Sequence, residues 1–69
     1  MIEIFKTNVQ QRSEADIIID QLLQHMPGSR INFDLHDCDK ILRIEGNDFH
    51  PDQVIEIVQG IGFSCCMLN

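Results

Sequence analysis

Residues 30–45, RINFDLHDCDKILRIE, decide the fold of this chain. Apolar and polar side chains alternate over residues 30–36 and again over residues 40–45, which is the period of a β-strand with one buried and one solvated face. The three residues between these runs, 37–39, include two aspartates, which favour turns. The stretch therefore predicts a β-hairpin.

The segments on either side of the hairpin predict two more strands, over residues 2–7 and 63–68. An amphipathic helix is predicted between the first strand and the hairpin. Its expected N-cap is Ser13, paired with Asp16 in a capping box, and Pro27-Gly28 ends it.

A second helix follows the hairpin, with Pro51 at its first position and Gly60 and Gly62 at its end. The chain is thus one α+β domain, residues 1–69, in the order strand–helix–strand–strand–helix–strand. Two helices with one apolar face each cover the same side of one sheet. Right-handed crossovers give an antiparallel sheet of order 4-1-3-2, a ferredoxin-like open-faced sandwich. The residues expected to be most buried are Ile19, Leu22, Phe33, Ile44, Val54 and Val58.

Charge and cysteine usage narrow the classes of partner. The net charge is −6 and the five Lys and Arg residues are scattered, so they cannot neutralise a run of phosphates. We expect neither nucleic acid nor a membrane surface as a partner. No stretch has the length and apolar character of a signal-peptide core or a membrane span. Three cysteines form no even disulfide framework, and free thiols persist in a reducing compartment, so we expect a cytoplasmic protein.

Three segments carry the packing features of a known family: LLQHMPG at residues 22–28, INFDL at 31–35 and IVQGIGF at 57–63. They resemble the heavy-metal-associated domain of copper chaperones and metal-pumping ATPases. That family has a Leu-rich helix end, a glycine, an alternating strand that ends in Asp-Leu, and a Gly-aromatic turn into its last strand. The resemblance covers nearly the whole chain and implies the same ferredoxin-like fold.

The loop after the first strand lacks the family's metal site. In the family, two cysteines spaced three apart in this loop bind a soft metal, whereas residues 8–15 here are NVQQRSEA, without a cysteine. The resemblance therefore implies a member without the usual thiolate pair. We expect no soft metal at residues 10–14, and we expect a capped helix start, with Glu14 and Asp16 near its positive end, to keep this loop ordered.

A relocated metal site is one alternative hypothesis. His36 and Cys38 lie at the predicted hairpin tip among aspartates, and Cys66 lies in the last strand. Thiolate, imidazole and carboxylate ligands together bind ions such as Cu(I) or Zn(II). The competing interpretation is an exposed acidic turn. Cys65 and Cys66 are adjacent in a strand, so they face opposite sides of the sheet and form a poor chelate.

The leading hypothesis is a non-catalytic binding module, because no nucleophile–base pair is recognisable by its spacing and so small a domain has little stability to spare for a strained active site. Its expected partner is another protein or a second copy of itself, bound at the sheet face that no helix covers. Phe5, Ile41 and one thiol of the last strand are predicted to point to that face. A small-ligand regulatory domain, binding at a sheet edge between subunits, is the remaining hypothesis.

Overall fold

A computed structural model describes residues 1–68, and these contain two helices and four strands in the predicted order. The hairpin, both flanking strands and both helices are therefore confirmed, as is the α+β class. The elements are β1 (Ile2–Thr7), α1 (Arg12–His25), β2 (Arg30–Asp34), β3 (Ile41–Glu45), α2 (Pro51–Ile61) and β4 (Cys65–Met67).

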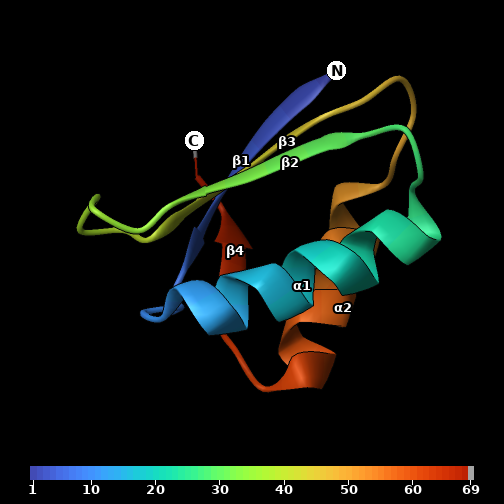
Figure 1. Ribbon diagram of the computed structural model, residues 1–69. Coiled ribbons are helices and arrows are strands. Elements are labelled where there is room, and N and C mark those ends of the chain that lie inside the picture. The colour runs from blue at the N-terminus through green and yellow to red at the C-terminus, as the bar shows by residue number, and fades with distance from the viewer. Residues whose placement is uncertain (69) are drawn as a thin grey trace.

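The four strands form one antiparallel sheet in the order β2-β3-β1-β4. This is the predicted order 4-1-3-2, counted from the other edge. Both helices pack on one side of the sheet and against each other, which leaves the other side open (Figure 1). Within residues 1–68, neither helix combines the length and the apolar character that crossing a bilayer requires.

The strand register decides which side chains are buried. Phe5 of β1 lies opposite Leu42 of β3 and Met67 of β4, and Phe33 of β2 lies opposite Leu42 on the other side. These residues form one row beneath the helices, and Phe5 and Leu42 have no exposed surface. The prediction that Phe5 points to the open face is therefore wrong. Both faces of β1 carry apolar side chains, and the register with β3 places its aromatic residue in the core.

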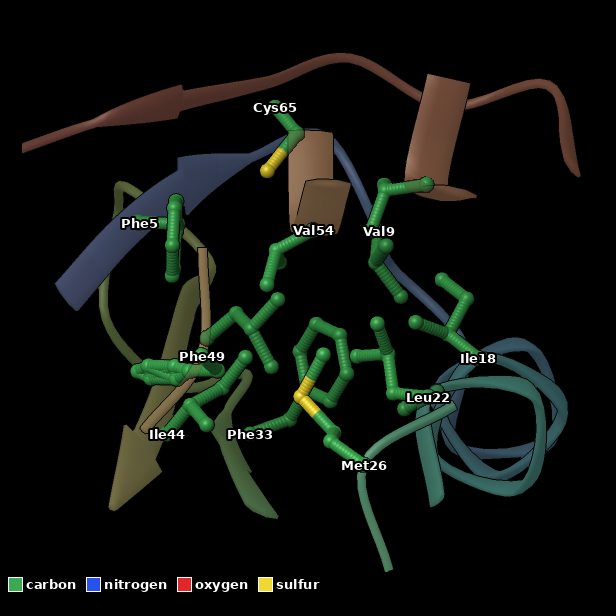
Figure 2. Packing of buried hydrophobic residues seen from close by; sticks show 13 residues of the cluster. Phe5, Val9, Ile18, Leu22, Met26, Phe33, Ile44, Phe49, Val54 and Cys65 are labelled. Carbon is green, nitrogen blue, oxygen red and sulfur yellow. The ribbon is translucent and has the colours of Figure 1, made fainter. Parts of the chain in front are cut away.

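The core lies between the inner face of the sheet and the two helices (Figure 2). Five of the six predicted core residues are buried, and the exception is Ile19, which is half-buried. Ile18 takes its place, on the same helix face as Ala15. Residues 17–19 are three consecutive isoleucines, so the helical period fits either choice and packing against the sheet selects Ile18. The five confirmed residues are Leu22, Phe33, Ile44, Val54 and Val58.

The start of α1 differs from the prediction. Gln11 is the N-cap, and its N–H donates a hydrogen bond to Oε1 of Glu14 (3.1 Å). Ser13 lies inside the first turn, and Asp16 pairs with Arg12 across an Nε–Oδ1 distance of 3.4 Å instead of forming a cap. Burial of Val9 in the core fixes where the chain enters the helix, and this tertiary contact overrides the local cap preference.

Hydrogen bonds anchor the β1–α1 loop at both of its sides. The Val9 N–H donates to the hydroxyl oxygen of Thr7 (3.2 Å), and that hydroxyl donates to the Lys40 carbonyl (2.6 Å). Asn8 Oδ1 accepts a bond from the Ser64 N–H (2.9 Å), which ties the loop to the segment before β4. The loop is thus held against both the hairpin and the segment that precedes the last strand.

Three strands are shorter than predicted: β3 by one residue, and β2 and β4 by more. β2 ends at Asp34 because its carboxylate accepts the His36 N–H (3.2 Å) and the chain turns there. β4 begins at Cys65 because Gly62 and Phe63 form the cap that ends α2. The Phe63 N–H donates to the Val58 carbonyl (3.2 Å), and Gly62 takes a left-handed conformation with φ of 120° that only glycine adopts easily.

Candidate functional site

The tip of the β2–β3 hairpin gathers three ligand-bearing side chains. The Cys38 thiol and the carboxylates of Asp37 and Asp39 have ligand atoms that all lie within 4.8 Å of one another. Cys38 and Asp37 are exposed. Within residues 1–68, no other group of three or more His, Cys, Asp or Glu side chains is gathered as closely.

The carboxylates at the hairpin tip already have structural partners. Asp37 Oδ1 accepts the Asp39 N–H at 2.8 Å, and Asp39 Oδ1 lies 3.7 Å from Nζ of Lys6. The first contact is the side-chain-to-backbone bond by which aspartate stabilises a turn. The group therefore offers an ion one soft thiolate and two hard oxygen donors, a mixed set that suits Zn(II) better than Cu(I).

The other two predicted ligands lie outside this group. His36 is an exposed residue of the turn, two positions before Cys38. Cys66 lies on the open face of the sheet, opposite Lys6 in the register of β1 and β4. The structure thus pairs Cys38 with its two flanking aspartates rather than with His36 or Cys66.

The open face of the sheet carries an apolar strip along β1 and β4. Ile2 and Leu68 expose 50% and 42% of their surface, and Ile4 is half-buried. The Leu68 N–H donates to the Ile4 carbonyl (2.9 Å), which places these two residues side by side. Cys66 and half-buried Ile41 lie on the same face, one on each side of β1. We call Ile2, Ile4, Ile41, Cys66 and Leu68 the open-face strip.

The two sides of the molecule differ in charge. The open face carries Lys6, Arg30 and Arg43, which are three of the five basic residues, beside Asp34 and Glu45. The two helices contain five Asp and Glu residues and only one Lys or Arg residue, Arg12. The outer helix surface is therefore strongly acidic, whereas the open face has mixed charges around an apolar strip.

The adjacent thiols of β4 have different environments. Cys65 is buried in the core beneath the sheet, whereas Cys66 is exposed on the open face, as the strand alternation predicts. Burial, with a smaller contribution from the neighbouring Cys66, raises the pKa of the Cys65 thiol from its ordinary value of 9.0 to about 12. The thiolate is the reactive form, so Cys65 is chemically protected.

Iodoacetamide is expected to alkylate Cys38 and Cys66 of the native protein and to leave Cys65 unmodified at about pH 8. In denaturant all three thiols should react. Mass spectrometry of the digested protein measures each site separately. Equal labelling of Cys65 and Cys66 in the native state would show that β4 does not bury its first residue.

Comparison with family models, with curated proteins and with solved structures finds no match to this chain.

The sequence predicted only two members of the open-face strip, Ile41 and one thiol of the last strand. Ile2, Ile4 and Leu68 were not predicted to belong to it. The available signal was the alternation of β1, which places Ile2 and Ile4 on one face and Phe5 on the other. That pattern defines two faces without saying which of them is buried. The position of Leu68 follows from its bond to β1, which no local pattern indicates.

Proposed function

We propose that this chain is a small non-catalytic binding module, similar to heavy-metal-associated domains but without their thiolate pair. It binds another protein, or a second copy of itself, through the open face of the sheet. The observation that carries this proposal is the open-face strip. Ile2 and Leu68 are about half exposed there, on the side of the sheet that neither helix covers.

The fold supports this proposal without identifying the family. The strand order and the placement of both helices on one side are compatible with the ferredoxin-like arrangement of heavy-metal-associated domains. The β1–α1 loop, where that family binds metal, is closed here by hydrogen bonds to the hairpin and to the segment before β4. Three free thiols suit a reducing compartment, which supports a cytoplasmic location.

The distribution of charge favours the open face over the helix face as the interface. Fully burying an exposed isoleucine or leucine side chain contributes about 1.5–3 kcal/mol. Ile2 and Leu68 are about half exposed, so completing their burial contributes roughly half of that for each, and these two aliphatic residues form the centre of the proposed interface. The acidic outer surfaces of α1 and α2 repel each other in any pair that brings them together. A pair of copies therefore meets most easily with both open faces inward.

Ile2→Asp is expected to weaken association strongly, because it places a charge in the apolar strip. The matched control is Ile17→Asp, since Ile17 exposes 55% of its surface on α1 and Ile2 exposes 50% on the sheet. Sedimentation velocity from micromolar to millimolar protein measures self-association. We expect a concentration-dependent dimer for the wild type and for Ile17→Asp, and a monomer for Ile2→Asp.

A strictly monomeric wild type would contradict self-association and direct the test to a separate partner protein. In that case a photo-crosslinking residue at position 2 should capture a protein that the same residue at position 17 does not. Equal association or equal capture at the two positions would contradict the open face as the interface. Circular dichroism of each variant separates loss of binding from loss of fold.

Zinc binding at the hairpin tip is a second candidate function, favoured by the grouping of Asp37, Cys38 and Asp39. A bound ion would hold the Cys38 sulfur as a thiolate ligand and slow its reaction with an alkylating agent. Under anaerobic conditions, Zn(II) is expected to slow alkylation of Cys38 several-fold and to leave the rate at Cys66 unchanged. Identical rates at Cys38 with and without Zn(II) would exclude this site.

A further inference from the structure

The end of the sheet opposite the hairpin tip contains a pocket of about 340 Å³. It lies between the end of α1 and the start of α2, two elements that are separated by the whole hairpin in sequence. Met26 and Phe49 form its buried apolar side, and the rest of the lining comes from the two helix ends and the loops beside them and is mostly polar. Two of the three histidines of the chain, His25 and His50, line this one pocket.

The hydrogen bond made by His25 leaves one ring nitrogen free. Its Nδ1 lies 3.0 Å from the Gln21 carbonyl oxygen, which can only accept, so Nδ1 carries the proton. In the neutral ring, Nε2 therefore holds an unshared electron pair. A backbone carbonyl that fixes the tautomer in this way is the usual support of a metal-binding histidine.

The charges around the pocket favour a cation. Asp48 contributes a carboxylate to the lining, and neither lysine nor arginine lines the pocket. The pocket also lies beside the C-terminal end of α1, where the helix dipole places partial negative charge. The net charge of the chain, −6, also favours a bound cation. The positive N-terminal end of α2 disfavours a cation in the pocket. The carboxylate of Asp52, in the first turn of α2, offsets that positive charge.

We propose that this pocket binds a divalent transition-metal ion, with Zn(II) as the probe, through His25 Nε2, the His50 imidazole and the Asp48 carboxylate. Imidazole together with carboxylate is a ligand set that Zn(II) accepts. All three residues are exposed, and their ligand atoms are not as closely gathered as those of the hairpin tip. Binding therefore requires rotamer changes of the exposed Asp48 and His50 side chains, which occur within nanoseconds, while His25 keeps its bond to the Gln21 carbonyl.

This site does not depend on the proposed interface or on the hairpin tip. It contains no cysteine and lies at the other end of the sheet from Cys38. The experiment therefore uses a background in which Cys38→Ser and Cys66→Ser remove both exposed thiols. Zn(II) is titrated into this protein and followed both by calorimetry and by amide chemical shifts.

The three histidines supply matched variants, because all of them are exposed and only two of them line the pocket. We expect His25→Gln and His50→Gln each to weaken Zn(II) binding at least about tenfold. His36→Gln should leave the affinity unchanged, and Asp48→Asn should give a smaller loss. Chemical-shift changes should centre on residues 25–29 and 47–53.

Absence of Zn(II) binding in the background protein would overturn the proposal. So would an affinity that falls equally in His36→Gln, or chemical-shift changes centred on residues 36–39. Thermal unfolding of each metal-free variant confirms that the substitutions leave the fold intact. A rise in the unfolding midpoint on adding Zn(II), present in His36→Gln and lost in His25→Gln and His50→Gln, would confirm the site independently.

Discussion

Replacing Leu22 with alanine is expected to unfold most of the population of this domain at room temperature. Leu22 has no exposed surface, and its side chain points from α1 into the core (Figure 2). Truncating a fully buried leucine costs about 2–5 kcal/mol of the free energy of unfolding. A domain of 69 residues has a total stability of only a few kcal/mol, on the order of 3–5. Denaturant titration followed by circular dichroism measures this loss.

The neighbouring Leu23 supplies the control, because it undergoes the same chemical change on the outer side of α1. It exposes 36% of its surface, so Leu23→Ala should cost less than about 1 kcal/mol. Similar losses for the two variants would show that α1 packs with a different face. A stable Leu22→Ala protein would contradict the core described above.

Phe5→Ala is expected to be at least as damaging, with a loss of about 3–5 kcal/mol. The ring is fully buried in a central strand, between Leu42 of β3 and Met67 of β4. Its removal leaves a cavity bordered by two strands of one sheet, which cannot close without disturbing the register. The variant should be largely unfolded by circular dichroism and should bind a dye that recognises exposed apolar surface.

Ile2→Ala tests the opposite face of the same strand. Ile2 is half exposed, so the substitution should cost less than about 1 kcal/mol and should lower self-association. The reverse result, a folded Phe5→Ala protein that no longer associates, would place Phe5 on the open face. The two variants thus separate the role of the core from the role of the interface.

The sequence predicted the elements well because their signals are local. The alternation in residues 30–45 and the helix-ending residues Pro27 and Gly62 depend on neighbours in the chain, and the structure confirms the elements that they define. Errors and omissions occurred where residues far apart in the chain decide whether a side chain is buried. Val9 and Phe49 are buried, and each is the single apolar residue of a polar loop. An apolar residue among polar neighbours was the only sequence signal for their burial.

The candidate sites were predicted less completely than the fold. An exposed Cys38 beside two aspartates follows from the turn sequence, and the structure shows these three residues together. The order of the elements places the end of α1 and the start of α2, with His25 and His50, at the same end of the sheet, but the pocket that both histidines line could not be predicted in this way. It depends on the packing of two helix ends whose histidines are separated by the entire hairpin.

The sequence by itself determined the number and order of the elements, the α+β class and the pairs of residues that share a face. The tertiary structure alone decided which face of β1 is buried and which isoleucine of α1 enters the core. It also decided which loop residues complete the core and which residues line the pocket between the two helices. The physical reason is that side-chain periodicity separates two faces of an element but assigns neither to the interior. That assignment depends on the strand register and on helix packing, which are contacts between residues far apart in the chain.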